Sequence, residues 1–112
     1  MYKLVFHRDL GDRWHEFPRS QQILAIASEL QRAANFLKAN DSFEAKNAYE
    51  RAFELLDLTI DITSVTAERY ELLRLREMLG HLYLNEPGNM KLVKRLFDVL
   101  ISLNKDSFNV LH

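Results

Sequence analysis

The residues with the clearest chemical potential lie close together in the chain: Arg74, Arg76, Glu77, His81 and Tyr83. On a helix of about 3.6 residues per turn, Arg74, Glu77 and His81 stack along one stripe, because they stand at i, i+3 and i+7. An imidazole beside a carboxylate and a guanidinium can act as a general acid or base on a phosphodiester, since the carboxylate sets the tautomer and the guanidinium holds the phosphate. RNA supplies its own nucleophile, the 2′-hydroxyl. The cluster therefore suggests RNA cleavage that needs neither a metal ion nor another cofactor.

The same spacing is also typical of ordinary surface pairs. Arg74 with Glu77, and Glu77 with His81, would each contribute only about 0.2–0.5 kcal/mol on a solvated helix. Arg76 stands about 140° around the helix from His81, so the two meet only through a local bend or across two subunits. The residues alone leave the catalytic and the surface-pair interpretations open.

Residues 76–83, Arg-Glu-Met-Leu-Gly-His-Leu-Tyr, follow the pattern of an Arg, any four residues, a His, any one residue and a Tyr. This pattern resembles the signature of the HEPN family, helical-bundle proteins of toxin–antitoxin and RNA-processing systems. The resemblance extends loosely over residues 20–103. An alanine-spaced hairpin with Ala45, Tyr49 and Ala52 precedes the motif, and Asn85-Glu86-Pro87 and a last amphipathic helix follow it.

The resemblance implies roles for the residues of the motif. Arg76 and His81 would form a ribonuclease pair, assembled with their symmetry mates at a dimer interface, with Arg74 and Glu77 as supporting residues. Tyr83 would be the residue that a nucleotidyltransferase-type partner protein modifies with a nucleotide. This chain departs from the family pattern at Glu77, where a small polar residue is usual, and at Gly80, where an apolar residue is usual. A glycine there also lets a ligand or another subunit approach closely.

A second group of basic residues, Lys91, Lys94 and Arg95, lies on the last predicted helix. With Arg74 and Arg76 it would form a phosphate-binding surface, although a solvated helix face explains the same pattern. The chain carries 15 Lys and Arg against 16 Asp and Glu, so its net charge is −1. No overall positive field gathers nucleic acid, and any contact with RNA must be local.

The elements that must position these residues are predicted to be helices of a single all-α domain. The 112 residues include only 3 Gly and 2 Pro, and 47% of them are hydrophobic, a composition typical of helical proteins. Apolar residues recur at helical spacing in four stretches. They predict helices over about residues 20–39, 42–60, 65–84 and 90–103, with Asp41 and Glu44 as a capping box and a loop at 85–89. We expect an up-and-down four-helix bundle with a short N-terminal extended arm.

The two ends of the chain differ from the bundle. Residues 1–19 are expected to form the arm and residues 20–112 the helical bundle domain. Alternation of apolar residues at positions 2–6 indicates a short strand or an extended segment, and residues 11–13 indicate a turn. Trp14 is the expected anchor of the arm on the bundle. His7, Asp9, Asp12 and His15 match the spacing of no known metal site, and residues 104–112 form a polar tail that is either docked or frayed.

The sequence is compatible with two functions of different classes. The first is a HEPN-like bundle that binds or cuts RNA; the second is a non-catalytic helical interaction or scaffold protein, such as a homodimeric adaptor. A homodimer is expected because Phe36, Phe43, Phe97 and Ile101 exceed what one small core holds. The lack of Cys and of any long apolar stretch predicts a cytoplasmic protein without a membrane span.

Overall fold

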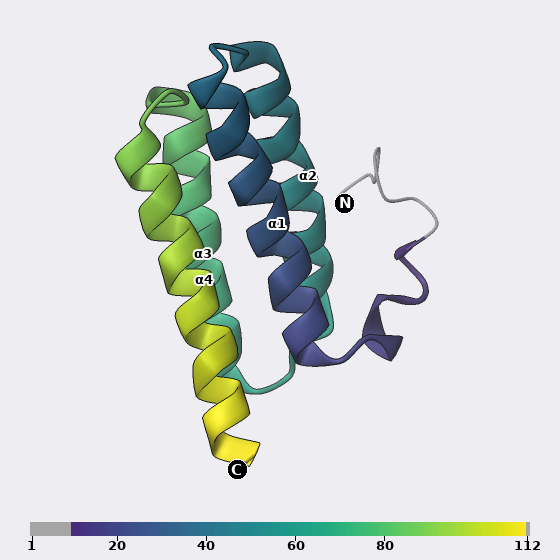
Figure 1. The fold of residues 1–112 in the computed structure, drawn as a ribbon. Helices are drawn as coiled ribbons and strands as arrows, with labels where there is room; N and C mark the ends of the chain where they lie inside the picture. The colour runs from purple at the N-terminus through teal and green to yellow at the C-terminus, as the bar shows by residue number, and fades with distance from the viewer. Residues whose placement is uncertain (1–9, 112) are drawn as a thin grey trace.

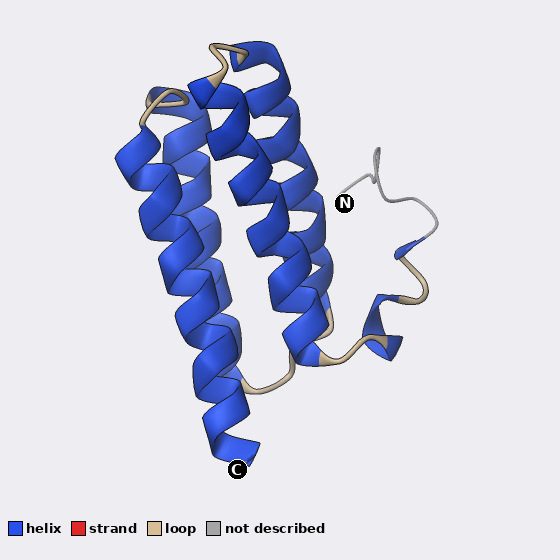
Figure 2. Ribbon diagram, viewed as in Figure 1, coloured by secondary structure: helices blue, strands red, loops and turns tan. Residues whose placement is uncertain are grey.

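The computed structural model describes residues 10–111, with side chains as far as residue 103. It contains a short 3-10 helix, η2 (Trp14–Glu16), followed by four α-helices: α1 (Arg19–Lys38), α2 (Ser42–Asp61), α3 (Thr66–Asn85) and α4 (Met90–Leu111). Successive helices run antiparallel, and α4 returns alongside α1 (Figure 1). Within residues 10–111 the regular structure is entirely helical (Figure 2). The predicted all-α up-and-down four-helix bundle is confirmed.

The link between α1 and α2 shows why the chain reverses at Asn40. Asn40 has a positive φ of 58°, a conformation that Asn tolerates better than most residues. The N–H of Asp41 donates to Phe36 O at 2.8 Å and that of Asn40 donates to Leu37 O at 3.1 Å, which is a Schellman motif. Asp41 then caps α2, because its side chain accepts a hydrogen bond from the N–H of Glu44 at 3.1 Å. Only three residues, 39–41, therefore separate the end of α1 from the start of α2.

The other two connections are fixed by side chains as well. In the turn before α3, Arg69 donates to Ile60 O at 2.9 Å and Arg19 donates to the hydroxyl of Thr63 at 2.7 Å. In the loop before α4, the phenol of Tyr49 donates to Pro87 O at 2.6 Å. The bond to Ile60 O satisfies a carbonyl at the end of α2, and the other two hold Thr63 and Pro87, so both loops are tied to the bundle.

The core combines small and large apolar side chains. Ala33, Ala48 and Ala52 are fully buried, and their size permits the close packing of α1 against α2. Leu residues of all four helices fill the remaining interior. Helix α1 packs closely against both α2 and α4, whereas α3 and α4 form the most loosely packed neighbouring pair.

Trp14 is confirmed as a residue that anchors the N-terminal segment on the bundle. Trp14 is buried, its indole N–H donates to the hydroxyl of Thr59 at 2.9 Å, and its ring lies against Phe17. Gln22 donates to the carbonyls of Trp14 and Phe17, both at 3.0 Å. The expected turn at residues 11–13 is present. The expected strand at 2–6, as well as His7 and Asp9, lies outside the described residues.

Two expectations about the ends of the bundle need correction. Helix α4 continues to Leu111, eight residues beyond its predicted end at Leu103, because no Gly or Pro interrupts residues 90–112. The four apolar residues expected to exceed the core were also assigned wrongly in part. Phe36, Phe97 and Ile101 are half-buried, and of the four only Phe43 is largely exposed.

None of the described helices combines the length and the apolar character needed to cross a lipid bilayer.

Candidate functional site

Arg76 lies on the side of α3 that faces α2. Its Nε donates to Asp57 Oδ1 at 2.6 Å and its Nη2 donates to Asp57 Oδ2 at 3.4 Å. The guanidinium also lies 5.4 Å from the ring centroid of Phe53. This two-pronged pairing is the geometry in which Arg binds a carboxylate most strongly. A phosphate group that bound Arg76 in the same way would have to displace Asp57.

Tyr83 lies two turns further along the same side of α3. Its phenol donates to Glu50 Oε2 at 2.8 Å, its ring meets those of Tyr49 and Phe53 edge-on, and the ammonium of Lys46 lies 5.3 Å from its centroid. The hydrogen bond to Glu50 raises the pKa of Tyr83, and burial and the Glu50 charge add to the effect. Burial raises the pKa of Tyr49 to about 12. Both phenols are therefore neutral at physiological pH.

His81 is on a different side of α3 and is exposed. Its Nε2 lies 2.9 Å from Glu86 Oε2 and its Nδ1 lies 3.2 Å from the amide nitrogen of Asn85. Because an amide nitrogen only donates, Nδ1 accepts and the ring proton is on Nε2. The carboxylate of Glu86 therefore orients the imidazole. An exposed, oriented imidazole can serve as a general acid or base.

The structure does not bring Arg76 and His81 together within one chain. Helix α3 runs without a break through both positions, so they stay about 140° apart around its axis. A shared site requires a second protomer, which keeps the dimeric arrangement as a prediction. In the described part of the chain, Arg74 pairs with Glu71 at 3.9 Å and not with Glu77.

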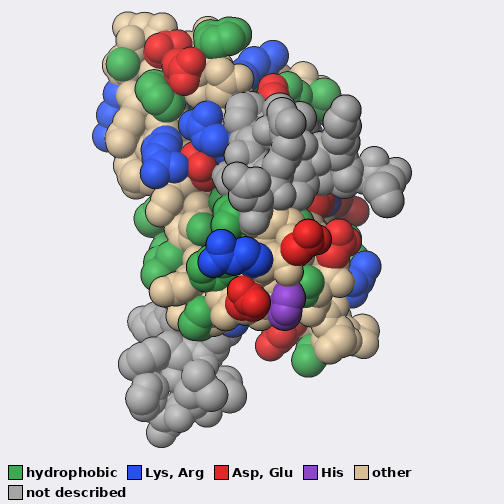
Figure 3. Space-filling view, turned by 90° about the vertical axis from the view of Figure 1, so that its right-hand side faces the viewer, with side chains coloured by type: hydrophobic (Ala, Val, Ile, Leu, Met, Phe, Trp, Pro, Cys, Tyr) green, Lys and Arg blue, Asp and Glu red, His purple; other side chains and the backbone are tan. Residues whose placement is uncertain are grey.

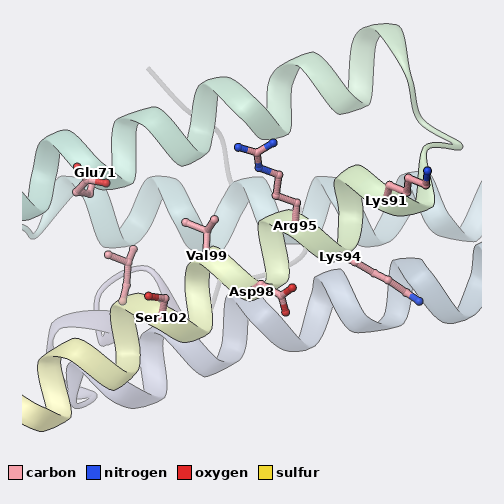
Figure 4. A pocket seen from close by; sticks show the side chains of 8 residues that line it. Glu71, Lys91, Lys94, Arg95, Asp98, Val99 and Ser102 are labelled. Atoms are coloured by element: carbon pink, nitrogen blue, oxygen red, sulfur yellow. The ribbon is translucent and has the colours of Figure 1, made fainter.

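The basic residues predicted to bind phosphate do line one depression. Lys91, Lys94 and Arg95 border an open groove between α3 and α4, the α3/α4 groove, with a volume of about 710 Å³. Figure 4 shows Arg95 reaching from α4 toward α3, while Lys94 points to the other side of α4. Glu71 and Asp98 border the same groove. Among the described side chains, neither Arg74 nor Arg76 contributes to it.

A feature that the sequence reasoning missed is the outer face of α3, defined here as Tyr70, Leu73, Glu77, Gly80 and Leu84. At about 100° per residue these positions fall within an arc of about 80°. Their side chains lack cover from the described chain: Tyr70 is 62% exposed, Leu73 41% and Leu84 77%. A Cβ built on Gly80 meets nothing within 4 Å. The alternating steps of three and four residues were the available signal, because they repeat the a and d positions of a heptad.

Charge is mixed on the described part of the face drawn in Figure 3. On the coloured part of the face in Figure 3, which is the right-hand side of Figure 1, basic and acidic side chains alternate without a large area of one sign. The partners of Arg76 and Tyr83 were also missed: Glu50 and Asp57 stand seven residues apart on α2, so they lie on one stripe facing α3. The arrangement thus offers an oriented imidazole, a paired guanidinium and an uncovered apolar face.

Searches of protein-family models, of curated proteins and of solved structures return no match to this chain.

Proposed function

We propose that the protein is a helical interaction module that forms a homodimer through the outer face of α3. The supporting observation is the distribution of exposed apolar side chains. Among the described residues, seven large hydrophobic side chains are exposed, and five of them belong to α3 or to the turn before it: Ile62, Val65, Tyr70, Leu73 and Leu84. Such a concentration on one helix and the turn before it is typical of an interaction surface, whereas scattered apolar residues are normal on any protein.

The outer face of α3 is self-complementary when two copies pack antiparallel. With the twofold axis near Glu77, Tyr70 lies opposite Leu84 of the partner subunit, and Leu73 lies opposite Gly80 of the partner subunit. The second pairing places a large side chain over the open gap at Gly80, so the helices can approach closely. The seam from Tyr70 to Leu84 is about 21 Å long. A module of this kind presents two copies of every other surface to its partners.

The oligomeric state of the purified protein tests this proposal. We expect sedimentation velocity to show a dimer for the wild type and a monomer for Leu84→Glu, because each new carboxylate would be buried against Tyr70 of the partner subunit without a countercharge, which is costly. Leu24→Glu is the matched control, since Leu24 is 44% exposed and belongs to α1, which packs against α2 and α4. A wild-type monomer at about 100 µM, far above the Kd of a stable dimer, or equal behaviour of the two variants, would contradict the proposal.

One observation favours a second candidate function. This function is RNA binding or metal-independent RNA cleavage of the HEPN type in a toxin–antitoxin-like system. His81 is exposed and is held by Glu86 and Asn85 in a defined tautomer. In antiparallel packing the same flank of both α3 helices meets, so Arg76 lies beside Arg76 of the partner subunit. Only parallel packing brings Arg76 beside His81 of the partner subunit. Modification of Tyr83 by a nucleotidyltransferase-type protein would first have to break its bond to Glu50.

Two measurements separate these functions. Because the chain has no Cys, a single Leu84→Cys substitution reports the orientation: parallel helices place the two thiols within disulfide reach, about 7 Å between Cα atoms, and antiparallel helices do not. Structured RNA incubated with wild type and with His81→Ala then reports the chemistry. The nuclease proposal expects a Leu84→Cys disulfide and cleavage that His81→Ala abolishes. The absence of cysteine also leads us to place the module in a reducing compartment, the cytoplasm.

A further inference from the structure

Two hollows flank α4, and they share residues. The first is the α3/α4 groove. The second, the α1/α4 recess, has a volume of about 220 Å³; its apolar lining includes Leu30, Ala34, Val93 and Phe97, and Lys94 and Asp98 border it as they border the groove. An apolar cavity of about 150 Å³ already holds benzene, so the recess can accept one Leu or Phe side chain. The two hollows therefore form one surface across α4.

Positive charge predominates around this surface, because four basic side chains and two carboxylates of the described residues border it. Lys38 borders the recess, and Lys91, Lys94 and Arg95 border the groove. Among the side chains of residues 10–103, none forms an ion pair with any of these four. Lys91 also lies in the first turn of α4, where the helix dipole is positive and a cation is unfavourable. An anionic ligand would relieve this repulsion.

The shape and the remaining charges favour a peptide over a nucleic acid. The residues that line the α3/α4 groove extend from Lys91 to Leu103, about 18 Å along α4, which matches three turns of a helix. Glu71 and Asp98 border the groove as well, and they would repel a strand that carries a phosphate at every nucleotide. A peptide can place a basic residue beside them and an apolar side chain in the recess.

We infer that the surface across α4 is a docking site for an acidic amphipathic helix of a partner protein. Carboxylates of that helix pair with Lys91, Lys94 and Arg95, and a large apolar side chain enters the recess beside Phe97. This is the binding mode in which a helix lays its apolar face into a groove. The site does not depend on the homodimer, because it uses the seam between α3 and α4 and the α1 side of α4, not the outer face of α3.

Fluorescence anisotropy with a designed probe tests the site. The probe is a fluorescein-labelled helical peptide of about 16 residues, with Glu residues flanking a Phe and Leu stripe and one Lys placed to face Glu71 and Asp98. We expect saturable binding that weakens at least about tenfold between 50 and 300 mM salt and about tenfold in Lys94→Glu, because Lys94 borders both hollows. Lys46→Glu is the matched control: it makes the same charge change on α2 and should alter the affinity by less than about twofold.

Other probes decide what the surface prefers. A peptide with every Glu replaced by Gln should bind at least about tenfold more weakly, and a single-stranded RNA oligonucleotide should not displace the acidic peptide. The inference is overturned by no peptide binding, by equal loss in Lys94→Glu and Lys46→Glu, by equal binding of the Gln peptide, or by displacement by RNA. Arg95→Glu provides a second test, and circular dichroism confirms that each variant folds. Leu84→Glu should still bind the peptide. The peptide test therefore gives an answer even if the protein does not form the proposed homodimer.

Discussion

The guanidinium of Arg76 is held within its own chain by Asp57 and by the ring of Phe53. The carboxylate of Asp57 is the more buried partner, with its side chain 14% exposed against 43% for Arg76. Pairs of this kind are screened by solvent on one side only, so they contribute more than fully exposed pairs. The main structural role of Arg76 in the single chain is therefore to tie α3 to α2.

Removal of Asp57 tests that role. We expect Asp57→Ala to lower the free energy of unfolding by about 1–2 kcal/mol, because it removes the carboxylate that accepts two hydrogen bonds from a half-buried guanidinium. Urea denaturation of Asp57→Ala, Arg76→Ala and the double variant gives the coupling between the two side chains, which should be about 0.5–1.5 kcal/mol. Additive single effects would show that the ion pair has no stabilising role.

The phenol of Tyr83 provides a prediction about alkaline pH. Its pKa is raised chiefly by the hydrogen bond to Glu50, so Glu50→Gln should move the pKa back toward the ordinary value of 10.0. Ultraviolet absorbance of tyrosinate during a pH titration measures the shift. A variant that titrates like the wild type would show that Glu50 does not hold the proton.

The sign of the linked stability change follows from the same shifts. In the unfolded chain Tyr49 and Tyr83 lose their phenolic protons near pH 10, before they lose them in the folded chain. Their contribution to the free energy of unfolding is therefore complete below pH 10. It is lost as the pH rises through the folded values, which for Tyr49 is about 12. Stability measured by urea denaturation should therefore fall steadily above pH 10, and less steeply in Glu50→Gln.

At the scale of the elements, the sequence predicts most helix boundaries because specific residues mark them. Asn40, Asp41 and Pro87 predicted the two connections at residues 39–41 and 85–89. Asn40 ends α1 and Asp41 caps α2 as expected, and Pro87 lies in the loop after α3. The end of α4 carried no such residue, so the amphipathic pattern alone placed it too early. Trp14 was also predictable, since a large aromatic side chain in a polar segment is stable only when it is packed.

Asn40 gives the clearest test of a boundary. Its positive φ of 58° is strained for alanine and for most other residues that carry a Cβ. Asparagine tolerates this conformation better, and glycine adopts it freely. We expect Asn40→Ala to lower the free energy of unfolding by about 1 kcal/mol and Asn40→Gly to leave it unchanged or slightly higher. Thermal unfolding of both variants makes the comparison, and a loss in Asn40→Gly equal to that in Asn40→Ala would contradict this account.

At the scale of the whole molecule, the fold was more predictable than the surroundings of the candidate site. Apolar spacing fixes which side of each helix faces inward, and four such helices with short loops have few ways to pack. It does not fix which polar residues meet across a seam: the pairing of Arg76 with Asp57 depends on the axial offset of α2 and α3. Whether His81 meets Arg76 depends on a second protomer, which no single-chain pattern specifies.

The proposed homodimer makes a final prediction about Glu77, the polar residue at the centre of the outer face of α3. A polar residue at such a position lowers the stability of an interface while specifying its register. Replacement by Leu should therefore strengthen self-association by about tenfold or more. Because dimerisation stabilises the folded state, the Tm of Glu77→Leu should rise more with protein concentration than that of the wild type, and the Tm of Leu84→Glu should not depend on concentration. A Glu77→Leu protein whose Tm is as independent of concentration as that of Leu84→Glu would show that two copies of this face do not meet.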